Sequence, residues 1–242
     1  MARNVAQVVD PPRPVNREMR TLDREGVRAF LEVARSTGYY PLFHLAVYTG
    51  LRRGEILGLR WKDVNLDMAS LSVVQTLQRL KGGLTVFLEP KTAKGRRSVA
   101  LSPAAVLVLR AHHKRQGQLR AILDGRLSED DLVFSHPDGS PLKPDTVSHA
   151  FSEIARKARL WGLRFHDLRH THATLMLQQG IHPKIVQERL GHANIAVTLD
   201  TYSHVLPGLQ EAAALRFDEG LVLSRDEPLA SSFPAEAVGR VG

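Results

Sequence analysis

The chain has 242 residues, of which 43% are hydrophobic and 24% are charged, a composition typical of one globular domain with a sizeable core. Lysine and arginine number 33 against 25 for aspartate and glutamate, and the formal net charge of +8 favours a polyanionic partner such as nucleic acid, although a basic surface also serves solubility or faces a membrane. The lack of cysteine excludes a disulfide scaffold and a thiolate metal site, and no long apolar run or signal peptide is visible. We therefore expect a soluble cytoplasmic protein with no membrane partner.

The first 20 residues have the composition of a linker or arm. Prolines stand at positions 11, 12 and 14, among arginines at positions 3, 13, 17 and 20. Such a segment is too rich in proline and too poor in periodic apolar residues to form a helix or a strand.

Two helices are predicted between residues 23 and 50. Asp23 is a suitable N-cap, and Gly38 ends the first apolar run. That run places apolar side chains at i, i+3, i+4 and i+7, namely Val27, Phe30, Leu31 and Ala34. A second helix ends near Gly50, and its C-terminus brings Arg52 to a loop or short turn.

Residues 70–101 change to an alternating pattern rich in β-branched side chains. The runs SLSVVQTL, LTVFLEP and RRSVAL are separated by turn residues at 81–83 and 92–95. This pattern predicts a three-stranded antiparallel sheet. Its second turn holds Lys91 and Lys94, and Arg96 and Arg97 follow directly.

Helices are expected again after this sheet. Ser102 and Pro103 are typical of a helix start, and the apolar residues after them continue a long helix toward Leu123. A further helix is predicted from about Asp145 to Arg159, and nearly all of the chain beyond it reads as helical. The fold class is therefore α+β, mainly helical, with a small sheet.

The most informative stretch is residues 164–205. On a helix His166 and Arg169 are spaced i,i+3 and share one face with His170, while an apolar stripe on the opposite face docks the helix and turns the polar groups outward. The apolar residues of that stripe are Leu168, Ala173, Leu175 and Met176. Two further short units end at His192 and Tyr202, so histidines, an arginine and a tyrosine are expected to converge.

These motifs resemble the tyrosine recombinase (phage integrase) family. The matching residues are HDLRH at 166–170, LGH at 190–192, and a tyrosine ten residues after that histidine. Upstream, TGLRRGEILGLRW at 49–61 is similar to the family's first arginine motif, and PKTAKGRRSVAL at 90–101 to its lysine hairpin. The resemblance covers roughly residues 20–208, and several motifs in the right order make it specific. It implies the catalytic-domain fold of that family.

The resemblance assigns a role to each matching residue. The implied catalytic residues are Arg52, Lys91, His166, Arg169, His192 and Tyr202. Two arginines suit the charge that develops on an attacked phosphodiester, and the lysine of the hairpin suits a general acid for the leaving 5′ oxygen. Tyr202 is the implied nucleophile, Glu55 orients Arg52 by its i,i+3 position, and Lys94 is the reserve candidate for Lys91. The expected DNA contacts are Arg53, Lys94, Arg96, Arg97 and His170.

The implied function is site-specific recombination or integration. Such an enzyme cuts and rejoins DNA strands through a covalent 3′-phosphotyrosine, and we expect no metal, cofactor or ATP. Double-stranded DNA is the expected partner of a protein that is monomeric in solution and tetrameric on DNA, with accessory DNA-bending proteins. The expected site of action is the nucleoid of a bacterial or phage-infected cell.

The resemblance also implies a division of the chain. Residues 21–208 form the catalytic domain, residues 209–223 a C-terminal helix that packs in trans or folds back in cis, and residues 224–242 a flexible tail. In the family a segment such as 1–20 follows an N-terminal DNA-binding domain, so we expect this chain to be a fragment or a truncated relic, or to hold DNA from one side. Ala100 stands where many members have proline.

Three other functions fit parts of the pattern. A zinc hydrolase would use the i,i+4 pair His166 and His170, with a third ligand from His172, His192 or His204. A noncatalytic DNA-binding regulator would use the short helices around Gly180 and Gly191 as a helix-turn-helix. A type IB topoisomerase shares the chemistry, but the spacing from HDLRH to LGH to Tyr202 favours a recombinase.

Overall fold

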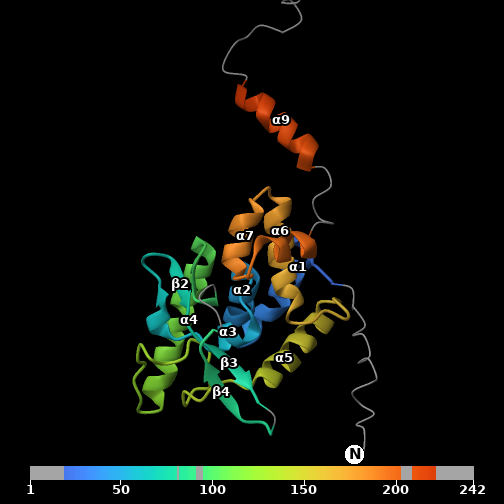
Figure 1. Ribbon diagram of the computed structural model, residues 1–242. Helices are drawn as coiled ribbons and strands as arrows, with labels where there is room; N and C mark the ends of the chain where they lie inside the picture. Colours follow the sequence, from blue (N-terminus) through green and yellow to red (C-terminus); the bar gives the residue numbers. More distant parts are fainter. Residues whose placement is uncertain (1–18, 81, 91–94, 203–208, 222–242) are drawn as a thin grey trace, which may run out of the picture. The chain divides into compact units, whose positions relative to one another are not determined.

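The computed structural model describes residues 19–80, 82–90, 95–202 and 209–221. The chain divides into two compact units, Met1–Val205 and Leu206–Gly242. The first unit is mainly helical and carries small antiparallel sheets, which confirms the predicted fold class (Figure 1). No helix in the described ranges has both the length and the apolar character needed to cross a membrane.

The first helix begins and the second ends where the sequence predicts, while the first ends at Arg35, before the predicted Gly38. Helix α1 (Arg24–Arg35) starts at Asp23, whose carboxylate accepts a 2.7 Å hydrogen bond from the Gly26 N–H. Helix α2 (Tyr40–Thr49) ends at Gly50, whose φ of 66° lies in the left-handed region that favours glycine. The short helix α3 (Arg53–Leu57) follows at once, so the end of α2 sets the position of Arg52.

A cluster of phenylalanines forms the centre of the core. Phe30 of α1, Phe43 of α2 and Phe151 of α5 (Pro144–Lys157) contact one another with ring centroids 5.1–5.8 Å apart. Phe165, just before α6 (Asp167–Gln178), joins this cluster at 6.0 Å from Phe43. The cluster therefore fixes the start of α6, where the HDLRH motif lies, against the N-terminal helices.

The strands pair differently from the prediction. The run SLSVVQTL is two strands, β2 (Ser70–Val73) and β3 (Thr76–Arg79), and each has a different partner. Strand β2 pairs with β1 (Val64–Asn65) and β5 (Arg97–Ala100), while β3 pairs with β4 (Thr85–Leu88) in a separate hairpin. A three-stranded antiparallel sheet is present as predicted, but it consists of β1, β2 and β5, so the prediction that residues 70–101 supply all three strands is wrong.

Packing against α3 explains why the run divides. The side-chain amide of Gln75 donates a 2.8 Å hydrogen bond to the Gly58 carbonyl, which holds the chain between β2 and β3 against the end of α3. A Cβ at Gly58 would lie 3.2 Å from the Gln75 carbonyl oxygen, a close approach that a larger residue could keep only if its neighbours shifted slightly. Lys91 and Lys94, expected in the turn before β5, lie outside the described residues.

Helix α4 (Pro103–Ile122) starts at Ser102 as expected, with the serine hydroxyl accepting from the Ala105 N–H. The buried Gln116 of this helix accepts a 2.8 Å hydrogen bond from the indole N–H of Trp61 in the 3-10 helix η2 (Trp61–Asp63). The amide of Gln116 donates in turn to the Leu132 carbonyl at 3.0 Å. These two hydrogen bonds of Gln116 join α4 to η2, which follows α3, and to the segment at Leu132.

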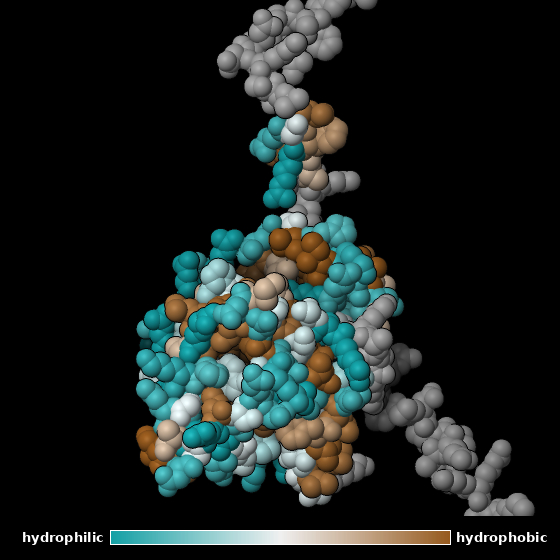
Figure 2. All heavy atoms as spheres, turned by 90° about the vertical axis from the view of Figure 1, so that its left-hand side faces the viewer, coloured by the Kyte–Doolittle hydropathy of each residue, from teal (hydrophilic) through white to brown (hydrophobic). Residues whose placement is uncertain are grey.

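The remaining helices of the first unit carry the other motifs. Helix α6 packs against α2 and α7 (Pro183–Leu190), and α7 packs against α8 (Ile195–Tyr202) (Figure 1). The expected C-terminal helix is α9 (Leu209–Leu221), which belongs to the second unit. It carries hydrophobic residues along one side and hydrophilic residues along the other (Figure 2), and Phe217 and Leu221 are exposed.

Gly50 provides a test of how the core positions the motifs. A Cβ at Gly50 would lie 2.7 Å from Leu190 Cδ2 and 2.8 Å from His172 Cδ2. An alanine at this position would destabilise the folded state both by its left-handed backbone conformation and by overpacking. Gly50→Ala should therefore lower the free energy of unfolding by about 2–5 kcal/mol. Urea denaturation measures this change.

Gly38→Ala is the matched control, because a Cβ at Gly38 meets nothing within 4 Å. This variant should be at least as stable as the wild type, since alanine restricts the unfolded chain more than glycine does. Equal free energies of unfolding for Gly50→Ala and Gly38→Ala would contradict the conclusion that a side chain at position 50 is not tolerated.

Candidate active site

A buried carboxylate holds two guanidinium groups at the start of α3. Arg52 is the N-cap residue, and Glu55 Oε2 accepts its backbone N–H at 2.8 Å in a capping-box arrangement. Glu55 Oε1 also accepts a 2.8 Å bond from the Arg52 side chain, as the i,i+3 spacing predicted. Arg97 of β5 donates to both oxygens of the same carboxylate, at 3.1 and 2.9 Å. Arg52 itself stays 44% exposed, so its guanidinium is oriented and still accessible.

Two opposing effects act on the pKa of Glu55. Burial alone raises the pKa of this carboxyl, but the hydrogen bonds and charges of Arg97 and Arg52 outweigh burial and lower it. The carboxylate is therefore ionised at neutral pH. A buried anion of this kind requires both of its cationic partners.

Arg97 lies inside the protein, whereas the sequence predicted a DNA contact at this residue. Its side chain is 7% exposed, and its donors go to Glu55, to the Arg189 carbonyl at 2.8 Å and to the Gly95 carbonyl. These acceptors lie inside the protein, so Arg97 has no donor directed to the surface. The two other described arginines that were expected to contact DNA are less buried than Arg97. Arg96 is 57% exposed, and Arg53 is half-buried and donates to the Ser148 hydroxyl and the Pro144 carbonyl.

Arg169 points into the protein, whereas the sequence predicted an outward polar face. It is 3% exposed, and its guanidinium donates to the Gly50 carbonyl at 2.9 Å and to the Leu190 carbonyl at 2.7 Å. These carbonyls belong to the C-terminal ends of α2 and α7, where backbone acceptors lack helical partners and the helix dipole favours a cation. Burial, and then the charge of Arg52, lower the pKa of Arg169 to about 9, so it stays protonated at neutral pH.

Two histidines flank these arginines. His166 precedes α6, and burial, then the charges of Arg169 and Arg52, lower its pKa. His192 follows α7, and its Nδ1 lies 2.9 Å from the Thr198 hydroxyl of α8. Burial lowers the pKa of His192 to about 4, and Arg169 and Arg52 contribute to the decrease. Both imidazoles are neutral at pH 7 and lie within electrostatic reach of both arginines.

Tyr202 is the last residue of α8 and is 1% exposed. Its hydroxyl lies 2.9 Å from Nδ1 of His170. Burial raises the pKa of this phenol to about 12, and the nearby charge of Arg169 opposes the increase. The structure thus brings together Arg52, His166, Arg169, His192 and Tyr202, while Lys91 lies outside the described residues.

His172 and Arg189 form a second buried network that the sequence did not indicate. Nδ1 of His172 lies 2.9 Å from the Val47 carbonyl, and its Nε2 accepts a 3.0 Å bond from Arg189 Nε. Arg189 also donates to the carbonyls of Ala100 and Tyr48, both at 2.9 Å. Burial and the charge of Arg189 lower the pKa of His172 to about 3, which keeps Nε2 free to accept. This network joins α7 to α2 and to the end of β5.

These contacts bear on the zinc alternative. His170 and His192 have their Nδ1 atoms on Tyr202 and Thr198, and His172 is engaged on both nitrogens. Within the described ranges, no group of three or more histidine, cysteine, aspartate or glutamate side chains is arranged to hold a metal ion. His204 lies outside those ranges.

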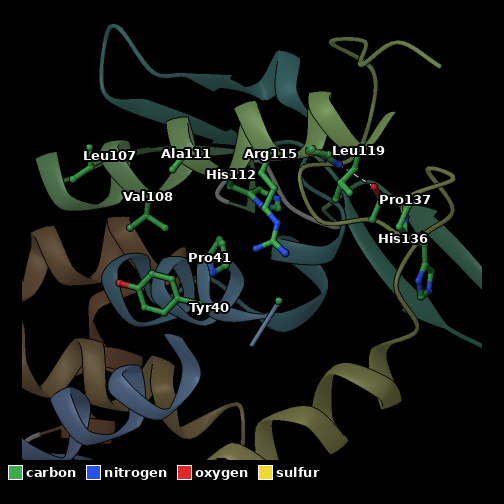
Figure 3. A pocket seen from close by; sticks show the side chains of 13 residues that line it. Tyr40, Pro41, Leu107, Val108, Ala111, His112, Arg115, Leu119, His136 and Pro137 are labelled. Carbon is green, nitrogen blue, oxygen red and sulfur yellow. Dashed lines mark hydrogen bonds between the residues drawn. The ribbon is translucent and has the colours of Figure 1, made fainter. Parts of the chain in front are cut away.

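Two surface hollows differ in character. One, of about 430 Å³, lies beside His166 and is lined by Arg53, Arg164, Ser148 and Ser152 with apolar residues, which suits an anionic backbone. The other, of about 380 Å³, lies between the start of α2 and helix α4 (Figure 3). Its lining is mainly apolar, and none of the described site residues contributes to it.

The comparisons with known proteins agree on one family. The family model described as "Phage integrase family" matches residues 20–208. A tyrosine recombinase XerC-like protein of Caldanaerobacter subterraneus subsp. tengcongensis is 30% identical, with 81% of this chain and 53% of that protein covered. The ICEBs1 integrase of Bacillus subtilis is 32% identical, with 75% of this chain and 49% of that protein covered. The chain thus spans about half the length of these relatives.

The same fold occurs in a solved structure. The Tn1549 transposon integrase in complex with circular intermediate DNA superposes with a TM-score of 0.69, covering 88% of this chain and 71% of that one. The identity is 23%, so this likeness establishes the fold alone.

The Glu55 network predicts a large stability difference between adjacent arginines. Arg97→Ala removes the bidentate partner of a buried carboxylate, so the free energy of unfolding should fall by about 3–5 kcal/mol. Arg96→Ala is the matched control, because Arg96 and its partner Glu89 are 57% and 75% exposed. Exposed pairs contribute about 0–1 kcal/mol, so the control should unfold almost as the wild type does.

Urea denaturation of both variants measures this difference. Similar small losses for Arg97→Ala and Arg96→Ala would show that the Glu55 carboxylate does not depend on Arg97.

Proposed function

Since the chain belongs to the phage integrase family, we propose that it is the catalytic part of a site-specific DNA recombinase. In this proposal it breaks and rejoins DNA strands through a covalent 3′-phosphotyrosine at Tyr202. The step needs neither a metal nor ATP, because the phosphotyrosine linkage keeps nearly the energy of the original phosphodiester.

The observation that carries the proposal is a pair of oriented guanidinium groups, of which Arg169 acts electrostatically on the Tyr202 hydroxyl. Glu55 orients Arg52, and the carbonyls of Gly50 and Leu190 orient Arg169. Attack on a phosphodiester gathers negative charge on the nonbridging oxygens, and donors that are already oriented stabilise this charge without reorganisation. The charge of Arg169 also favours ionisation of the phenol as it reacts.

The proposed reaction assigns roles to Tyr202, His192 and the lysines of the hairpin. The Tyr202 oxygen attacks phosphorus, the bond to the 5′ oxygen breaks, and the 3′ phosphate becomes attached to the tyrosine. Thr198 engages Nδ1 of His192, which leaves Nε2 to donate to a phosphate oxygen. The family motif assigns Lys91 as the acid that protonates the leaving oxygen, with Lys94 in reserve. Because Tyr202 is 1% exposed, DNA binding has to open the surface above its hydroxyl.

Double-stranded DNA is the proposed substrate and partner. The chain carries a net charge of +8, and the hollow beside His166 presents Arg53 and Arg164. Contacts of this type address phosphates and carry little sequence information, so binding should weaken steeply with salt. Assembly into a tetramer on DNA through α9, and a need for DNA-bending proteins, are further parts of the proposal that rest on the family resemblance.

A tyrosine variant tests the proposal. On a nicked duplex that loses its leaving strand, the wild type should form a covalent protein–DNA band on a denaturing gel. Tyr202→Phe removes only the nucleophilic oxygen and should abolish this band while DNA binding persists. Tyr40→Phe, a hydroxyl deletion beside the apolar pocket, should keep the band.

Two results would count against the proposal. An undiminished covalent band with Tyr202→Phe would exclude Tyr202 as the nucleophile. Loss of the wild-type band on addition of EDTA would favour a metal-dependent reaction.

A further inference from the structure

The nucleophile's hydroxyl contacts a histidine that the family motifs do not assign to catalysis. Nδ1 of His170 lies 2.9 Å from the Tyr202 hydroxyl oxygen, and the two ring centroids are 5.9 Å apart. His170 is on α6, one residue after Arg169, so it approaches Tyr202 from the helix that also supplies the buried guanidinium. From sequence alone this residue was expected to contact DNA.

The other two imidazoles of the site are placed differently. His166 packs edge-on against the His170 ring, with centroids 4.8 Å apart, and its contact is with that ring. His192 directs Nδ1 to Thr198 at 2.9 Å. Within the described residues, His170 is therefore the imidazole in hydrogen-bond contact with the Tyr202 hydroxyl.

We propose that His170 is the base that accepts the Tyr202 proton during attack on DNA, an inference that rests on the proposed phosphotyrosine chemistry. In this step the Tyr202 O–H bond breaks and its proton moves to Nδ1 of His170. A bond forms between the tyrosine oxygen and phosphorus, and the bond from phosphorus to the 5′ oxygen breaks. Religation returns the proton from Nδ1 to the tyrosine oxygen as the 5′ hydroxyl displaces it.

The surroundings of His170 support a neutral acceptor in the free protein. The charged and titratable groups that act on it are His166, Asp167, Arg169 and Arg164 around the start of α6, with His192 after α7 and Tyr202 on α8. Burial, then the interactions with His166, Arg169 and Arg164, lower the pKa of His170 to about 4, while Asp167 opposes this effect. The imidazole is thus unprotonated at pH 7, and Nδ1 can accept from the phenol.

The Tyr202 phenol is a much weaker acid than the protonated His170 imidazole, and this difference decreases as the phenol attacks phosphorus. The phenol of Tyr202 has a pKa raised to about 12, so complete transfer to His170 before attack is unfavourable. Bond formation to phosphorus makes the phenolic proton far more acidic, and the negative phosphodiester raises the basicity of the imidazole beside it. Proton transfer therefore accompanies attack.

The test measures the rate of covalent complex formation on the nicked duplex between pH 6 and 9. A general base typically contributes a factor of about 10²–10⁴, so His170→Ala should slow the reaction within that range while DNA affinity is retained. Added imidazole should restore part of the rate, and the variant should gain more from rising pH than the wild type does. His170→Gln, which keeps a hydrogen-bonding group without basicity, should be as slow as His170→Ala.

His136→Ala is the matched control, because His136 is an exposed histidine beside the apolar pocket. It should react at the wild-type rate and show no response to imidazole.

Three outcomes would overturn the assignment. A wild-type rate for His170→Ala or His170→Gln would show that no base is needed at this position. A His170→Gln rate close to wild type with a slow His170→Ala would indicate a positioning role. A faster His170→Ala would show that the hydrogen bond restrains Tyr202.

The proposed function fails separately from this inference. It fails if the wild type forms no covalent complex, or if Tyr202→Phe forms one. The His170 variants are informative once the wild type forms a covalent complex and Tyr202→Phe does not.

Discussion

The pairing of one buried carboxylate with two guanidinium groups is the interaction on which the site depends. Glu55 lies inside the protein with its charge retained, and an unpaired charge there would be strongly destabilising. Arg97 meets that requirement from β5 and Arg52 from the start of α3. Arg97 also bonds the Arg189 carbonyl in α7, so the carboxylate links three distant segments of the chain. The orientation of the exposed Arg52 follows from this buried pairing.

Unpaired carbonyls at helix ends supply the rest of the framework. The ends of α2 and α7 meet at Arg169, whose guanidinium satisfies one carbonyl from each helix. Arg189 donates to the carbonyls of Tyr48 and Ala100. It also donates to Nε2 of His172, which can accept only while that imidazole is neutral. The buried arginines therefore complete backbone hydrogen bonds, and Arg169 also places a positive charge near Tyr202. Stability and the proposed chemistry have the same origin here.

Local signals in the sequence predicted the elements well, because they act within one turn of chain. Asp23, Gly50 and Ser102 mark helix ends at the expected positions, and the i,i+3 spacing of Arg52 and Glu55 gives the observed pair. The predictions that differ from the structure concern contacts between distant segments of the chain. The first long strand divides because α3 packs at Gln75, and Arg169 turns inward because two helix ends need a donor. The inward placement of Arg97 and the contact of His170 with Tyr202 have no local pattern that reveals them.

In the proposed function the Tyr202 oxygen becomes covalently bonded to DNA, and this bond is open to direct chemical identification. The covalent complex formed on a nicked duplex can be digested with a nuclease and a protease and its peptides analysed by mass spectrometry. We predict that the peptide containing Tyr202 carries the added mass of a nucleotide 3′-phosphate and that fragmentation locates this mass on Tyr202. The same mass on another residue, or unmodified peptides throughout, would contradict it.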